Sequence, residues 1–188
     1  MPPTFSYAAT RVAAEPARER YDGATITFHW ITAALIATLW VIGQTRFYVP
    51  AAWRHDYLSL HIALGMTLGV VLLGRILWRA TAGRHLPAIE DRLMHLAATA
   101  AHAALYLLML GAVALGLTKV MTGGNEVFHL FAFPALAPGN RTLNHLIGGW
   151  HALAANAIMI LAGVHAAAAI FHHAVLRDGV LRRMLPFL

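Results

Sequence analysis

The chain has 188 residues, of which 59% are hydrophobic and only 12% are charged. Because soluble domains usually carry about 25% charged residues, this composition excludes an ordinary soluble domain and indicates an integral membrane protein. There is no cysteine, which excludes disulfides, thiolate-bound zinc, iron–sulfur clusters and cofactors attached through cysteine. The net charge of +6 comes almost entirely from arginines.

The first 24 residues contain several prolines and arginines and lack the apolar core of a cleavable signal peptide. We expect residues 1–24 to form a flexible cytoplasmic tail. Four later stretches contain no Asp, Glu, Lys or Arg and are long enough to cross a hydrocarbon core, which takes about 20 helical residues. These stretches are residues 25–44, 57–74, 93–118 and 142–176. The sequence therefore predicts an all-α protein in which residues 25–188 form one transmembrane four-helix bundle.

A shorter apolar segment, residues 127–137, precedes the fourth span. It is too short to cross a bilayer and contains Pro134, which disfavours a continuous helix. An interfacial or re-entrant segment is expected here.

Arginines flank the four spans unevenly. Ten lie in the N-terminal tail, around the connection between the second and third spans, or in the C-terminal tail. Only four basic residues flank the opposite ends, namely Arg46, Arg54, Lys119 and Arg141. The positive-inside rule then places both termini in the cytoplasm. The net positive charge is explained as a topology signal, so nucleic-acid binding is not predicted.

Histidines occur inside the spans at spacings that suggest pairs. His151 and His165 of the fourth span are 14 residues apart, so they differ by about 40° around a helix and by about 21 Å along it. His29 lies near the start of the first span, at a depth similar to that of His165, whereas His61 lies near the start of the second span, at a depth similar to that of His151. The sequence predicts two cross-helix pairs, His29 with His165 inside and His61 with His151 outside.

Two imidazoles at one depth on facing helices suit the two axial positions of a six-coordinate haem iron. Zinc would require three or four clustered ligands, often including a carboxylate, and the spans contain no Asp or Glu. This disfavours a metal-cation transporter. His172 lies within about 20° of His165 around the helix and is the alternative inner ligand. Depth favours His165, because a separation of about 31 Å between His151 and His172 would reach the membrane edge.

The same residues carry a resemblance to a known family. The chain resembles the bacterial cytochromes b561, small four-helix dihaem proteins of the inner membrane. The matching pieces are "FHW" at 28–30, His61 with Gly65 and Arg75, "HAALYLL" at 102–108, and residues 150–186 with "WH", "GVHAAAAIFHH" and "RDGVLRRMLP". The resemblance implies that the first and fourth helices hold one haem b and the second and fourth helices hold the other. It therefore implies the same two histidine pairs and favours His165 over His172.

The resemblance also implies electron transfer through two haems to or from ubiquinone in the bacterial inner membrane. Some members are similar enough in architecture to imply oxidation of superoxide at the periplasmic face, with ubiquinone as acceptor. The alternative is an electron-transfer subunit without catalysis of its own, whose donor is a dehydrogenase or a soluble redox protein. No catalytic residue is predicted.

Four further residues are candidate cofactor contacts. Arg75, at the inner end of the second span, can pair with a haem propionate or a quinone oxygen. Alternatively, it only adds to the positive charge that sets the orientation of the spans. His102 and Tyr106, one turn apart in the third span, can contact a propionate, line a quinone pocket, or join two helices. His172 can pass protons to a quinone, or it lies in interfacial water. No role is predicted for His55, His85, His95, His129 and His145.

Overall fold

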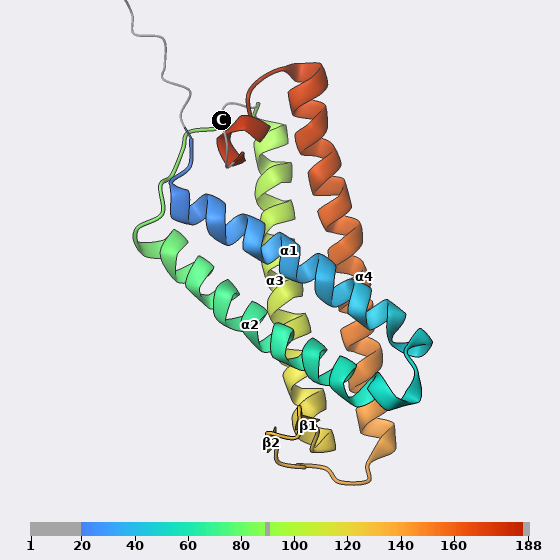
Figure 1. The fold of residues 1–188 in the computed structure, drawn as a ribbon. Coiled ribbons are helices and arrows are strands. Elements are labelled where there is room, and N and C mark those ends of the chain that lie inside the picture. Colours follow the sequence, from blue (N-terminus) through green and yellow to red (C-terminus); the bar gives the residue numbers. More distant parts are fainter. Residues whose placement is uncertain (1–19, 89–90, 186–188) are drawn as a thin grey trace, which may run out of the picture.

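The computed structural model describes residues 20–88 and 91–185, so residues 1–19 of the tail predicted for residues 1–24 lie outside the described chain. Four long helices dominate the fold (Figure 1). They are α1 (Gly23–Thr45), α2 (Arg54–Thr81), α3 (Arg92–Gly123) and α4 (Arg141–Phe171). By length and composition each is able to cross a membrane. The predicted all-α, four-helix architecture is confirmed, and the cytoplasmic placement of the termini stays a prediction.

Polar caps explain where three of these helices begin. Asp22, Asp91 and Asn140 each precede a helix and accept a hydrogen bond from the backbone N–H three residues later, which satisfies a donor that the first turn leaves free. At the other end of α3, Gly124 adopts a φ of 67° and closes the helix in the left-handed conformation that glycine tolerates best. The apolar stretches therefore become helices with ends defined by local hydrogen bonds.

Short elements connect the helices. Two 3₁₀ turns, η1 (Arg46–Tyr48) and η2 (Ala51–Trp53), join α1 to α2. The antiparallel strands β1 (Glu126–Val127) and β2 (Phe131–Ala132) form a hairpin between α3 and α4. After α4 come a π-helical turn, η3 (His172–Leu176), and a 3₁₀ turn, η4 (Leu181–Met184). The segment expected to be interfacial or re-entrant thus contains the hairpin, which lies at one end of the bundle (Figure 1).

The two ends of the bundle differ in what they contain. We call the end with β1 and β2 the hairpin end. At the opposite, terminal end, the Tyr21 N–H donates to the Arg183 carbonyl at 3.2 Å, so the two described chain ends meet there. Asp22 also lies there, accepting bonds from the Trp78 indole and the Arg84 N–H, both at 2.9 Å. Burial raises the pKa of Asp22, but these bonds and those from Thr25 outweigh it and hold the pKa well below its usual range.

Side-chain packing divides the bundle into two helix pairs. α1 packs most extensively on α2, and α3 on α4, whereas α1 with α4 and α2 with α4 pack sparsely. One buried cluster contains Leu72, Met109, Ala112 and Ile158. A second, of Ile62, Val120 and Val127, attaches the hairpin to α2 and α3. The sparse helix pairs are the ones that the predicted histidine pairs join.

Candidate functional site

The predicted histidine pairs meet in space. The ring centres of His29 on α1 and His165 on α4 are 6.3 Å apart, and those of His61 on α2 and His151 on α4 are 6.0 Å apart. Imidazole nitrogens bind first-row metals at about 2 Å, and each ring nitrogen lies about 1 Å from its ring centre, so two axial imidazoles of one metal have centres about 6 Å apart. Both separations fit one metal ion between the rings.

A single continuous helix sets the distance between the two pairs. His151 and His165 both lie within α4, which is α-helical from Arg141 to Phe171. Fourteen residues at about 1.5 Å each place them about 21 Å apart along the axis. The pair of His61 and His151 is nearer the hairpin end, and the pair of His29 and His165 is nearer the terminal end. Axial ligation by these residues remains a prediction.

The pair near the hairpin end has features expected of metal-binding imidazoles. His151 Nδ1 bonds the Ala112 carbonyl at 2.9 Å, and because a carbonyl only accepts, Nδ1 carries the proton and Nε2 remains available for a metal. Gly116 gives this ring its space, since a Cβ there would stand 3.2 Å from His151 Cε1. The half-buried ring of His61 faces His151 from α2. The residues present therefore fit an axially ligated macrocycle.

Arg75 shapes the pair near the terminal end. Its Nη2 donates to His29 Nδ1 at 3.2 Å. A guanidinium has only donors, so the neutral His29 ring must carry its proton on Nε2. A metal at Nε2 requires the opposite tautomer, with the proton on Nδ1. Binding of a metal at His29 Nε2 would therefore release Arg75 for an anionic or carbonyl partner.

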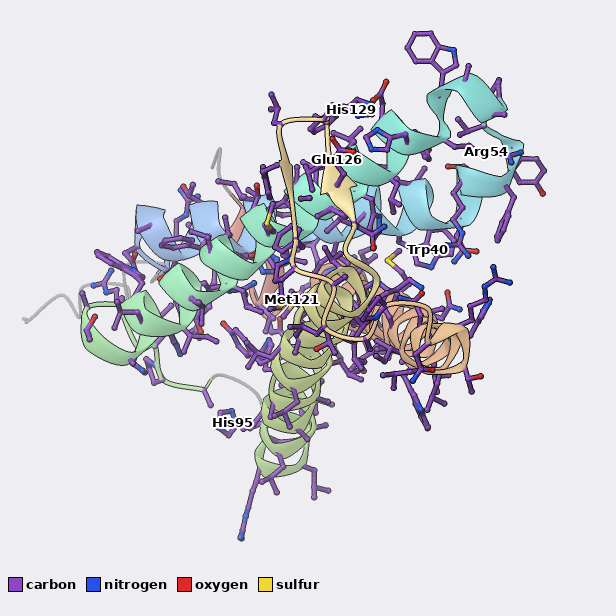
Figure 2. The ribbon with its side chains drawn as sticks, turned by 90° about the horizontal axis from the view of Figure 1, so that it is seen from below. Trp40, Arg54, His95, Met121, Glu126 and His129 are labelled. Carbon is purple, nitrogen blue, oxygen red and sulfur yellow. The ribbon has the colours of Figure 1, made fainter. Side chains whose placement is uncertain are left out.

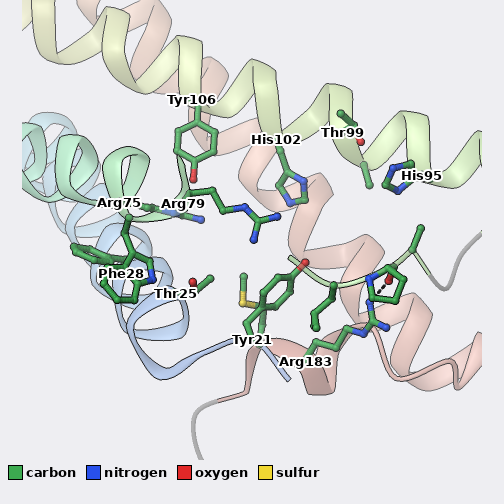
Figure 3. A pocket seen from close by; sticks show the side chains of 16 residues that line it. Tyr21, Thr25, Phe28, Arg75, Arg79, His95, Thr99, His102, Tyr106 and Arg183 are labelled. Carbon is green, nitrogen blue, oxygen red and sulfur yellow. Dashed lines mark hydrogen bonds between the residues drawn. The ribbon is translucent and has the colours of Figure 1, made fainter. Parts of the chain in front are cut away.

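His102 and Tyr106 of α3 lie beside this pair. The His102 ring centre is 5.2 Å from that of His165, and the Arg75 guanidinium carbon lies 5.3 Å from the centre of the Tyr106 ring. Arg75, His102 and Tyr106 face a common cavity of about 330 Å³ at the terminal end (Figure 3). This volume lies within the range of ordinary small-molecule sites. The structure thus brings together three candidates that the sequence selected separately.

The cavity also contains residues that the sequence analysis did not select. Tyr21 precedes α1, Thr25 and Phe28 belong to its first turns, and Arg183 comes from η4 (Figure 3). They come from opposite ends of the chain, so no local spacing relates them. The only sequence signal was the density of aromatic and basic residues near the predicted span ends.

His172 points to a different partner. Its Nδ1 forms a hydrogen bond with the Asp178 carboxylate, beyond the end of α4. Burial raises the pKa of Asp178, but bonds from His172 and from the Val180 N–H outweigh this and lower it. His172 thus belongs to the C-terminal turn, and His165 is the residue of α4 that faces His29.

A bundle of four membrane-length helices with histidine pairs at two depths defines the class of membrane-bound b-type cytochromes. Within that class, the model of the prokaryotic cytochrome b561 family matches residues 20–187, and the chain belongs to this family. Membership implies haem-based electron transfer across a membrane.

Individual relatives match over nearly the whole chain. The chain is 30% identical over 174 residues to "Cytochrome b561 homolog 2" of Escherichia coli (strain K12), covering 89% of this chain and 92% of that protein. It is 34% identical over 174 residues to "Cytochrome b562" of Cereibacter sphaeroides, covering 88% and 94%. It is 27% identical over 172 residues to "Probable superoxide oxidase CybB" of Yersinia pestis, covering 89% and 97%.

Proposed function

We propose that the chain is a dihaem cytochrome b that passes electrons between the two faces of the inner membrane, with its termini in the cytoplasm. His29 with His165, and His61 with His151, are the proposed axial ligands of two b haems. The observation that carries the proposal is the pair of ring-centre distances, 6.3 and 6.0 Å, both compatible with one iron between two imidazoles.

Haem b would supply a one-electron iron centre at each position. The chain's own residues supply position and environment. The Ala112 carbonyl fixes the tautomer of His151, which also sets the orientation of its ring. Sparse packing of α4 against α1 and α2 is compatible with a flat group between these helices.

For the acceptor, we propose ubiquinone in the cavity at the terminal end. Arg75, His102 and Tyr106 all carry donors suited to quinone oxygens. Reduction of ubiquinone to ubiquinol takes two electrons and two protons, and imidazole is the side chain best suited to deliver protons near neutral pH. His102 faces the cavity and is the proposed proton carrier.

For the donor, we propose superoxide at the hairpin end, which the proposed orientation places in the periplasm. Each superoxide would give up one electron and leave as dioxygen, so two are consumed per ubiquinol formed. Two observations support this choice. One relative is named a probable superoxide oxidase. Four basic residues flank the helices at this end and outnumber Asp56 and Glu126, and a positive surface attracts small anions.

The test is donor-specific reduction of the purified protein. A superoxide generator should produce the reduced b-type α-band, and ubiquinone should then return the oxidised spectrum. Superoxide dismutase should abolish the reduction. Reduction that persists with dismutase present would reject superoxide as donor, and an absent b-type spectrum would reject the haem assignment itself.

A second candidate is an electron-transfer subunit that docks a dehydrogenase or a soluble redox protein. It is favoured by the two relatives whose names describe only a cytochrome, without an oxidase activity. It predicts that superoxide leaves the haems oxidised while a copurifying redox partner reduces them.

A further inference from the structure

Three metal-ligating side chains gather at the hairpin end, away from both histidine pairs. His55 lies in the first turn of α2, Glu126 lies on β1, and His129 lies in the turn between β1 and β2. One ligand atom from each lies within 4.8 Å of the others. In the part of the chain that the structure describes, no other group of three His, Asp or Glu residues meets this spacing. Figure 2 shows Glu126 and His129 on the hairpin beside α2.

The ligand atoms of this cluster lie close together, and one of the two stacked rings has to turn before both can bind a common ion. The His55 and His129 rings are stacked, with centres 4.1 Å apart and planes 17° apart. His129 Nδ1 is 3.3 Å from Glu126 Oε1. His55 Nε2 is buried with no hydrogen-bond partner, whereas its Nδ1 is 3.4 Å from Asp56 Oδ1. An imidazole that binds a metal usually has one ring nitrogen hydrogen-bonded to a carboxylate or carbonyl, and the other ring nitrogen is the metal ligand.

The hairpin is fixed in the conformation that presents His129. Phe128 and His129 both have positive φ values, 50° and 57°, which non-glycine residues adopt only when their surroundings enforce it. The Phe128 N–H donates to the hydroxyl of Ser59 at 3.0 Å, and Ser59 is fully buried on α2, one turn beyond His55. The buried Val127 holds the strand on α2 and α3. The backbone thus keeps His129 against His55.

We propose that His55, Glu126 and His129 bind a divalent transition-metal ion, with Zn²⁺ as the best match. Two imidazoles and one carboxylate form a donor set typical of zinc, and a water can complete the tetrahedron. Tetrahedral zinc ligands lie roughly 3.3 Å apart, so binding requires the exposed side chains of Glu126 and His129 to turn, with His129 leaving its stacked position on His55. The bound ion would connect the hairpin to the start of α2.

This site is separate from the proposed haem ligands. His55 precedes His61 by six residues on α2, or about 9 Å along the helix. Binding of zinc therefore does not depend on the proposed electron transfer, and the two proposals can fail independently.

The test uses the full-length, untagged protein in detergent, treated with a chelator and then titrated with Zn²⁺ by calorimetry, with bound metal counted by elemental analysis. We expect one zinc per chain beyond any iron, with a Kd in the micromolar range or tighter, and no displacement by millimolar Mg²⁺, which prefers oxygen ligands. Affinity should fall as the pH is lowered, because protons compete with the metal for its ligand atoms.

Two variants and one control locate the site. His129→Ala and Glu126→Gln should each weaken zinc binding by at least about tenfold. His85→Ala, which removes an exposed histidine from the connection at the opposite end, should bind zinc as the unmodified chain does. An unchanged visible spectrum and helical circular dichroism would show that each variant is folded. Wild-type affinity in both folded site variants, or no zinc binding by the unmodified chain, would overturn the proposal.

A second measurement addresses the connection between hairpin and helix. Zinc should slow amide hydrogen exchange in residues 126–132, and this protection should disappear in Glu126→Gln. Equal exchange with and without zinc in the unmodified chain would contradict the proposed role of the ion.

Discussion

Replacing His151 with alanine tests the two-site assignment directly. The change removes one imidazole from the pair near the hairpin end and leaves His61 without its partner at 6.0 Å. The other pair shares only α4 with this site and lies about 21 Å away along it. Substitutions more than about 10 Å apart with no shared partners act almost independently. We therefore expect loss of one haem and retention of the other.

The size of the expected loss follows from the number of haems bound per chain. The pyridine haemochrome assay, referred to protein concentration, should fall from two haems per chain to about one. His165→Ala should have the same effect on the other site. His172→Ala is the matched control, because His172 bonds to Asp178 and should keep both haems. Two haems per chain in His151→Ala, or loss of both from a folded protein, would refute the assignment of independent sites.

Three more predictions concern the surroundings of these sites. Gly116→Ala places a Cβ 3.2 Å from His151 Cε1, so we expect lower haem retention or a shifted midpoint potential. Gly111→Ala is the control, because its Cβ would meet open space, and it should change neither property. Redox titration of both variants measures the difference. Arg75→Ala should keep both haems but slow reduction of added ubiquinone, measured by stopped-flow absorbance, and an unchanged rate would remove Arg75 from the quinone site. Asp22→Asn should lower the free energy of unfolding by about 1–3 kcal/mol at neutral pH. Folding lowers the pKa of Asp22 from its ordinary 3.8, so the carboxylate contributes to the free energy of unfolding above that pH. This contribution is lost as the pH falls through the lower pKa of the folded state. Melting curves of the two proteins should therefore converge in acid.

The helices and the histidine pairs were predictable because their signals are local or periodic. Long stretches without charged residues indicated the spans. Because successive helices run in alternating directions, the position of each histidine along its span gives its depth, and this was enough to match His61 with His151. The structure extends α2 from the predicted residue 74 to Thr81. Arg75 and Arg79 continue that helix, since a long arginine side chain can reach polar surroundings from within a span.

The remaining features depend on contacts between distant residues. Asp22 accepts bonds from Trp78 and Arg84, more than fifty positions away, and no pattern in the sequence relates these residues. The stacking of His55 on His129 likewise requires the positive φ values of the hairpin. The apolar residues around Pro134 do not predict the conformation of the hairpin turn, because packing on α2 determines the geometry of that turn.

The unbroken α4 helix has a consequence for variation in length. Each residue inserted between His151 and His165 would turn one ring by about 100° relative to the other and add about 1.5 Å. An insertion of one or two residues would point one imidazole away from its partner, whereas an insertion of seven would restore the facing within about 20° and lengthen the gap by about 10 Å. The segment between the two histidines therefore fixes their separation and relative orientation, and it tolerates substitution far better than insertion or deletion.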